Sequence, residues 1–124
     1  DFALCLPVIR DHISQMVFKD WAPETPVEVS AFGFTQPVAS QPDTTPEAVL
    51  LPLVGFDRKG ARLGQGAGHY DRALAAIPNA LRIGVAWSVQ EVEELPADPW
   101  DVPLDAVITE AEWILPASSR LEGR

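Results

Sequence analysis

The residues best suited to chemistry in this sequence lie between Arg62 and Arg72. Three alternate glycines, Gly64, Gly66 and Gly68, stand there between two arginines, directly before a helix expected to begin near His69. Unpaired backbone N–H groups and the helix dipole favour an anion at a helix N-terminus, and glycines let the backbone approach it closely. A flexible turn is the structural alternative, but the flanking arginines favour a phosphate site. Arg62 would supply charge to the phosphates, and Gln65 and Ala67 would supply backbone N–H groups.

The elements that position this loop can be read on either side of it. Residues 49–54 form an apolar run typical of a buried strand, and residues 56–60 have the composition of a turn. The expected helix covers residues 70–77 and ends at Pro78-Asn79. The loop is not a Walker A loop, because no G-K-[ST] closes it, and its glycine spacing is not that of a Rossmann fingerprint.

The rest of the chain predicts an α/β fold with a mostly parallel sheet. Further strands are expected at residues 2–9, 16–21, 81–87 and 104–109, and a short acidic helix or turn at 89–94. Pro7 indicates that the first strand stops early or lies near an edge. Residues 24–46 are rich in Pro, Thr, Ser and Gln, which predicts a long connection with a small ordered segment at 31–37.

Composition narrows the classes of partner. The 124 residues carry a formal net charge of −9, which argues against nucleic acid. No apolar run is long enough to span a membrane, and Cys5, the only cysteine, fits a reducing cytoplasm and a buried, inert thiol. Four basic residues gather near the glycines, so a basic loop is expected on an acidic body: Arg58, Lys59, Arg62 and Arg72. We expect a cytoplasmic monomer or weak homodimer that binds small molecules.

Residues 56–72, FDRKGARLGQGAGHYDR, closely resemble the signature of the 5-formyltetrahydrofolate cyclo-ligase (5,10-methenyltetrahydrofolate synthetase) family. The resemblance extends from about Ala3 to Trp113. It implies an enzyme that uses ATP as co-substrate and Mg²⁺ as cofactor to convert 5-formyltetrahydrofolate to 5,10-methenyltetrahydrofolate. It also implies a three-layer α/β/α fold like that of ribose-5-phosphate isomerase and the CoA transferases.

The resemblance also assigns roles to residues. It implies catalytic roles for Arg62 and Asp71, and Mg²⁺ ligation by Asp71 and Asp105, with Asp101 as the nearest competitor for the second ligand. The implied ATP contacts are Arg62, Leu63, Gly64, Gln65, Gly66, Ala67, Gly68, His69 and Tyr70. The implied folate contacts are Gln65, Gly66, Ala67, Gly68, His69, Met16 and Trp21.

Each assignment has a structural alternative. An acid such as Asp71 is favourable in the first turn of any helix, and Asp105 would otherwise be a solvated acid at a strand end. Met16 and Trp21 are equally well explained by core or strand-edge packing, and core packing is the expectation for Trp87.

The sequence departs from the family pattern in two respects. His69 replaces the first tyrosine of the usual Tyr-Tyr-Asp and adds a group that titrates near neutral pH. The family has a further basic, largely helical N-terminal segment, so residues 1–117 are expected to be one N-terminally truncated domain, with 118–124 as a flexible tail. Two other hypotheses stay open: a non-catalytic nucleotide- or folate-binding relative or inactive fragment, and an interaction domain whose glycine loop is purely structural.

Overall fold

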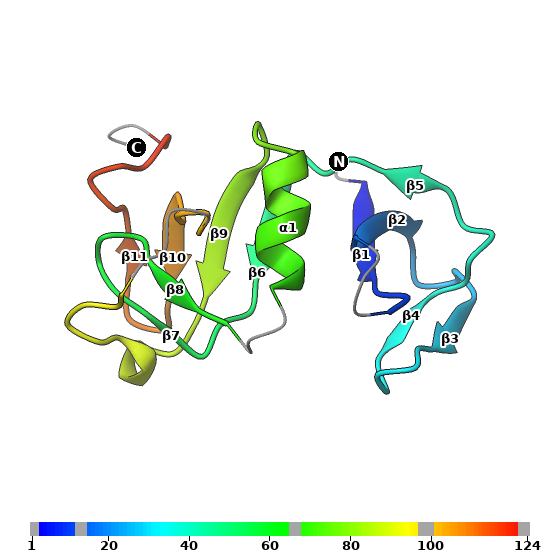
Figure 1. Cartoon of the computed structure of the whole chain (residues 1–124), viewed down its shortest axis with the longest axis horizontal. Coiled ribbons are helices and arrows are strands. Elements are labelled where there is room, and N and C mark those ends of the chain that lie inside the picture. Colours follow the sequence, from blue (N-terminus) through cyan, green and yellow to red (C-terminus); the bar gives the residue numbers. More distant parts are fainter. Residues whose placement is uncertain (1–2, 12–14, 65–67, 97–100, 122–124) are drawn as a thin grey trace. The chain divides into compact units, whose positions relative to one another are not determined.

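The structure is a computed structural model that describes residues 3–11, 15–64, 68–96 and 101–121. The chain divides into two compact units, residues 1–46 and residues 47–124. Each unit has its own sheets and its own buried side chains, and each is described by itself (Figure 1).

The first unit is built from short antiparallel strands. Strands β1 (Leu4–Val8), β2 (Val17–Trp21) and β5 (Asp43–Thr44) form one sheet in the order β1-β2-β5, and β3 (Val27–Val29) pairs with β4 (Thr35–Pro37). A parallel crossover needs a dozen or more residues, and only residues 9–16 separate β1 from β2. The short connection therefore makes β1 and β2 pair antiparallel.

Side chains from β1 and β2 form the centre of this unit. Val8, Met16 and Phe18 are buried there. Lys19 is buried as well, and its ammonium donates to the Gln41 carbonyl at 2.9 Å and forms an ion pair with Asp43. Because a buried ammonium must be paired, these contacts stabilise the position of β5 beside β2.

The second unit contains a four-stranded sheet and the only α-helix among the described residues. The sheet has the order β11-β10-β9-β6, from β6 (Ala48–Leu51), β9 (Leu81–Val85), β10 (Ala106–Ile108) and β11 (Trp113–Ile114). Strands β6, β9 and β10 are parallel, and β11 is antiparallel to β10. Between β6 and β9 the chain forms the hairpin β7 (Gly55–Phe56) and β8 (Arg62–Leu63), then helix α1 (His69–Ala76). A 3-10 turn, η1 (Ser88–Gln90), follows β9.

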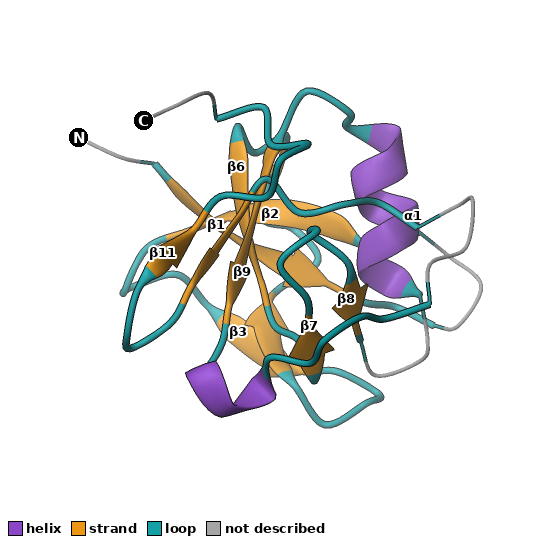
Figure 2. Ribbon diagram, turned by 90° about the vertical axis from the view of Figure 1, so that its left-hand side faces the viewer, coloured by secondary structure: helices purple, strands orange, loops and turns teal. Residues whose placement is uncertain are grey.

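Helix α1 covers one face of this sheet. Figures 1 and 2 together show α1 lying in front of the sheet. Val49, Leu51 and Val107 are buried, as are Ala73 and Leu74 of the helix. Strand β9 contributes Gly84 to this packed interior. A Cβ on Gly84 would lie 2.9 Å from a methyl of Leu53 and 3.0 Å from one of Leu104. A larger residue there would displace the core.

Most of the predicted elements are present, with three differences. The connection predicted at residues 24–46 contains β3, β4 and β5, whose short pairings carry no periodic pattern. The parallel arrangement holds for β6, β9 and β10 but not for the first unit, so the fold has mixed sheets. Trp87 was expected in the core and is instead 65% exposed, because β9 ends before it at Val85. Within the part of the chain that the structure describes, no helix has the length and apolar character needed to cross a membrane.

Candidate functional site

The β7–β8 hairpin holds Arg62 through a buried aspartate. Asp57 is 1% exposed, and its carboxylate accepts hydrogen bonds from the backbone N–H groups of Lys59, Ala61 and Leu95 at 2.9, 3.1 and 2.9 Å. Gly60 completes the turn with a φ of +96°, which favours glycine. These bonds fix the turn that leads directly into Arg62.

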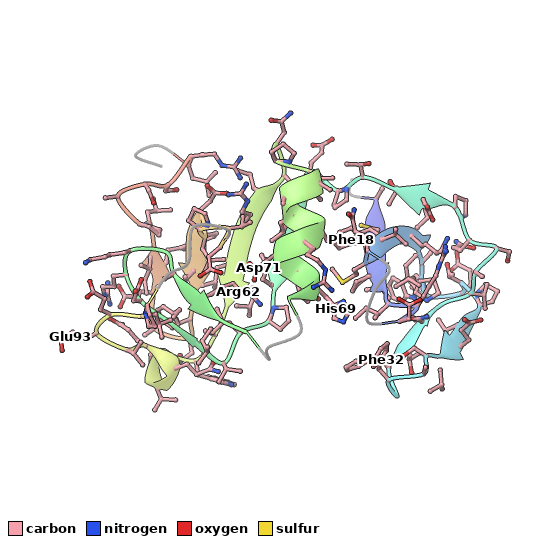
Figure 3. The ribbon with its side chains drawn as sticks, in the orientation of Figure 1. Phe18, Phe32, Arg62, His69, Asp71 and Glu93 are labelled. Atoms are coloured by element: carbon pink, nitrogen blue, oxygen red, sulfur yellow. The ribbon has the colours of Figure 1, made fainter. Side chains whose placement is uncertain are left out.

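Arg62 is a buried cation with donors to spare. Its side chain is 8% exposed, and its Nη1 lies 3.5 Å from Oδ1 of Asp71, while Nη2 donates to the Pro52 carbonyl at 3.3 Å. Its Nε is buried and has no hydrogen-bond partner among the described residues. Figure 3 shows Arg62 and Asp71 close together beside α1. Both distances are long for charge-assisted hydrogen bonds, so the guanidinium retains capacity for an anion.

Two neighbours shape the space around the guanidinium. A Cβ on Gly64 would lie 2.7 Å from Nη2 of Arg62, so only glycine leaves this nitrogen where it is. The Tyr70 ring centroid lies 5.8 Å from Cζ of Arg62, within cation–π range. Burial raises the pKa of Tyr70, and the nearby Arg62 charge opposes this only in part. Tyr70 is therefore a neutral phenol at physiological pH.

Helix α1 begins without a side-chain cap. Gly68 is its N-cap residue, in the left-handed region at φ +70°, and its carbonyl accepts the Arg72 N–H at 3.1 Å. Gly68 has no side chain that could cap this terminus, so the N-cap residue offers the first N–H groups of the helix no side-chain hydrogen bond. Asp71 lies in the first turn with its side chain 27% exposed, and Nδ1 of His69 lies 3.3 Å from the Arg72 guanidinium.

The structure brings together Arg62, Gly64, Tyr70 and Asp71 of the predicted site. Leu63, Gly68 and His69 adjoin them on β8 and at the start of α1. Three predicted contacts, Gln65, Gly66 and Ala67, lie outside the described residues. Met16 is buried and Trp21 is half-buried, and both belong to the first unit, whereas the glycine loop belongs to the second.

Asp105, the other predicted metal ligand, lies in a different environment. It is 3% exposed and forms an ion pair with Arg120 at 2.7 Å. Burial raises the pKa of this carboxyl group, but hydrogen bonds from Arg120 and from the Arg82 backbone outweigh that effect and hold it below its usual range. In the described part of the chain, no hydrogen bond or ion pair joins Asp105 to Asp71 or Arg62.

The predicted basic cluster is divided between two places. Arg58 binds Glu91 at 2.9 Å and Glu112 at 2.7 Å, and Lys59 binds Glu94. Hydrogen bonds to the two carboxylates raise the pKa of the Arg58 guanidinium. Two of the four cations in the predicted basic loop, Arg58 and Lys59, are therefore neutralised by acids that are distant in the sequence.

Sequence reasoning also missed Asp57. It was read only as part of a turn, yet its carboxylate organises the whole turn before Arg62. The Asp-x-x-Gly spacing of Asp57 and Gly60 was the available signal, because an aspartate before a tight turn often bonds to the backbone that follows it.

The chain is similar to a known family of proteins. Residues 2–110 match the model of the 5-formyltetrahydrofolate cyclo-ligase family. The chain belongs to this family. The match includes β8, the glycine loop and α1, so the arrangement around Arg62 lies within the part of the chain that the family shares.

Individual relatives carry the same name. The 5-formyltetrahydrofolate cyclo-ligase of Haemophilus influenzae is 38% identical over 106 residues, covering 80% of this chain and 57% of the relative. That of Escherichia coli K12 is 33% identical over 118 residues, covering 87% of this chain and 65% of the relative. The solved 5,10-methenyltetrahydrofolate synthetase of Aquifex aeolicus superposes with a TM-score of 0.77 at 34% identity, covering 95% of this chain and 60% of the other. The chain thus spans less than two thirds of the length of each.

Proposed function

We propose that this chain carries out, or forms the nucleotide-binding part of a protein that carries out, the ATP-dependent cyclisation of 5-formyltetrahydrofolate to 5,10-methenyltetrahydrofolate. The observation that carries the proposal is the family match over residues 2–110 together with the partly unsatisfied guanidinium of Arg62 beside an uncapped helix N-terminus. Arg62 and the start of α1 both belong to the second unit, so this part of the proposal depends on no arrangement of the two units.

The ATP phosphates would lie at the start of α1. A phosphate oxygen there would accept hydrogen bonds from Arg62 and from the first N–H groups of the helix. Gly64 and Gly68 permit this approach, and we extend the proposed contacts to Leu63, His69, Tyr70 and to Gln65, Gly66 and Ala67 on the family resemblance. Met16 and Trp21 are proposed folate contacts on the same basis, together with the loop residues 65–69.

Asp71 suits the role of a Mg²⁺ ligand. Mg²⁺ is commonly bound by one or two carboxylates, phosphate oxygens and water. Asp71 offers a partly exposed carboxylate in the first turn of the helix, with one long contact to Arg62. The described residues contain no group of three or more His, Cys, Asp or Glu placed to hold a metal by themselves. A metal here would therefore depend on the nucleotide, and it would supply charge neutralisation between the phosphates.

The reaction asks mainly for positioning. The formyl oxygen attacks the γ-phosphorus of ATP, and the bond from that phosphorus to ADP breaks. N10 of the folate then attacks the activated carbon, loses its proton, and inorganic phosphate leaves with the former formyl oxygen. Arg62 and the N–H groups of α1 would stabilise charge on the phosphoryl oxygens, which is the main contribution a protein makes to such a transfer.

Finer features of the complete protein follow the same resemblance. We infer a three-layer α/β/α arrangement of the ribose-5-phosphate isomerase and CoA-transferase type, to which the parallel strands β6, β9 and β10 would belong. We further infer a cytoplasmic monomer or weak homodimer without nucleic-acid or membrane partners, in line with the net charge of −9.

The test is turnover with matched variants. The chain is incubated with 5-formyltetrahydrofolate, ATP and Mg²⁺, and the absorbance of the methenyl product is followed. We expect ATP-dependent product that falls at least 100-fold in Asp71→Asn, as when one transition-state contact is lost. Glu93→Gln makes the same chemical change at an exposed position distant from Arg62 and Asp71, and it should leave turnover unchanged (Figure 3).

Binding separates the alternatives if no product forms. Calorimetry with Mg²⁺ and ATP that shows binding in the wild type and its loss in Arg62→Ala would favour a non-catalytic nucleotide-binding relative or fragment. A folded chain that neither turns over nor binds ATP would contradict the proposed function and leave the glycine loop as a structural element.

A further inference from the structure

Asp105 has no free lone pair to offer. An ionised carboxylate accepts about four hydrogen bonds, and four N–H donors surround this one. Oδ1 accepts from Nε and from the backbone N–H of Arg120 at 2.9 and 3.2 Å. Oδ2 accepts from Nη2 of Arg120 at 2.7 Å and from the backbone N–H of Arg82 at 2.9 Å. A metal ion would have to displace an arginine from a buried carboxylate.

Arg120 extends this contact to the end of helix α1. Its Nη1 donates to the Pro78 carbonyl at 2.5 Å, and its Nη2 donates to the Ala80 carbonyl at 2.6 Å. These carbonyls directly follow α1, whose last turn contains no basic residue of its own. A cation is favourable at a helix C-terminus, and Arg120 supplies it from a distant part of the chain.

Ser119 and Leu121 complete the attachment. The Ser119 hydroxyl donates to the Asp105 carbonyl at 2.5 Å and accepts the Leu121 N–H at 3.0 Å. Residues 119–121 lie within the segment 118–124 that the sequence predicts to be a flexible tail, yet each of the three takes part in a hydrogen bond.

We propose that Asp105 is a structural anchor and not a Mg²⁺ ligand: its buried carboxylate fastens residues 119–121 to the C-terminal end of α1 and the start of β9. The metal set of the proposed function then reduces to Asp71 and the nucleotide. Asp71 differs from Asp105 in both exposure and pairing. Its side chain is 27% exposed, and its ion-pair contact with Arg62 is 3.5 Å long.

The first experiment needs neither nucleotide nor metal, so it stands even if the proposed function fails. Thermal unfolding of the full chain is measured in the presence of a chelator for the wild type, Asp105→Asn, Arg120→Gln and the double variant. We expect each single change to lower Tm by on the order of 10 °C. Arg120→Gln leaves the carboxylate of Asp105, whose side chain is 4% exposed, without its cation, and Asp105→Asn turns a buried acceptor into an amide whose NH₂ group faces N–H donors. The double variant should lose clearly less than the sum of the two, because both changes break one contact.

Matched controls identify the source of the effect. Glu93→Gln repeats the carboxylate-to-amide change at an exposed position, and Arg58→Gln breaks an arginine–carboxylate contact whose arginine is 51% exposed. Each should change Tm by only about 2 °C. Strictly additive losses at Asp105 and Arg120, or an unchanged or higher Tm for Asp105→Asn in chelator, would overturn the anchor.

The second experiment measures metal dependence. Mg²⁺ is titrated in the presence of ATP, and binding is followed by the rise in Tm. For each variant, the rise in Tm is taken relative to its own Tm without Mg²⁺. We expect Arg120→Gln and Asp105→Asn to keep the apparent Mg²⁺ affinity within about twofold, and Asp71→Asn to weaken it at least tenfold. A tenfold loss in Asp105→Asn with Arg120→Gln unchanged would show that Asp105 ligates the metal. If ATP and Mg²⁺ leave the Tm of the wild type unchanged, the proposed function fails and the chelator experiment alone decides on the anchor.

Discussion

At the scale of single residues, Arg62 is the centre of the candidate site. It combines a side-chain exposure of 8%, an Nε that has no partner among the residues the structure describes, and a location directly before the glycines. A buried guanidinium with incomplete hydrogen bonding is unfavourable in the free protein, and a phosphate would satisfy it. This favours Arg62 as the residue that would bind a phosphate in the proposed function.

Gly64 provides the sharpest residue-scale prediction. In Gly64→Ala, the added methyl would meet Nη2 of Arg62 at 2.7 Å. The end of a long side chain can move away, so Tm should fall by only about 2 °C, whereas the displaced guanidinium should weaken ATP binding about tenfold. Calorimetry and thermal unfolding of the same sample check both halves. A loss of Tm large enough to account for the weaker binding would show that Gly64 acts through the fold.

At the scale of elements, the start of α1 depends on one backbone conformation. Gly68 has φ +70°, and a side chain in this left-handed region costs roughly 1 kcal/mol. Gly68→Ala should therefore reduce the free energy of unfolding by about 1 kcal/mol, measured by urea titration. Gly68→Asn should lose less, because asparagine tolerates this conformation better than alanine. Equal losses in the two variants would point to the Arg72 side chain, which lies 3.2 Å from the added Cβ.

Strand β2 makes a corresponding prediction for the first unit. Phe18 is 7% exposed in β2, whereas Phe32 is half-buried in the turn between β3 and β4. Phe18→Ala should destabilise the protein by about 3 kcal/mol and Phe32→Ala by clearly less, because only the first leaves a cavity in a closed core. Urea titration with hydrogen exchange at β1 and β2 measures the difference. Similar losses at the two positions would mean that the unit has no tightly packed centre around β2.

At the scale of the whole molecule, pH should act through Asp105. Burial raises the pKa of its carboxyl group, but hydrogen bonds from Arg120 and the Arg82 backbone lower it further, to a value below its ordinary 3.8. A carboxyl group whose pKa is lower in the folded state stabilises the fold above the unfolded value and loses that contribution as pH falls through the folded value. The stabilisation should thus be complete at neutral pH and disappear only below about pH 4.

The measurement compares two unfolding curves. At pH 7, Asp105→Asn should be less stable than the wild type by about 3 kcal/mol, and this difference should shrink as the pH falls from about 5 to 2. Arg120 forms an ion pair with the carboxylate and the charge of Arg82 also acts on it, and neither guanidinium titrates in this range. Urea titrations at several pH values, with Glu93→Gln as control, provide the data. A difference independent of pH would mean that folding does not change the pKa of this carboxyl group, which would contradict the prediction.

Local sequence patterns were sufficient to predict the elements around the glycine loop and to indicate the family. Strand β6, helix α1, β9 and β10 follow from local apolar patterns and from the Pro-Asn stop after the helix, because these signals act within a few residues. The loop signature, which includes Arg62 and Asp71, could likewise be recognised from the sequence, since its glycines and charges lie within one short stretch.

The pairing of the charged side chains could be known only from the folded chain. Arg58 meets Glu91 and Glu112, which are 33 and 54 residues away along the chain, and Asp105 meets Arg120 at a separation of 15 residues. No local pattern encodes such pairs, because a side chain's partner depends on which segments the fold brings together. The same reason separates two aspartates that the sequence treated alike: the fold leaves Asp71 partly exposed beside Arg62 and buries Asp105 against an arginine.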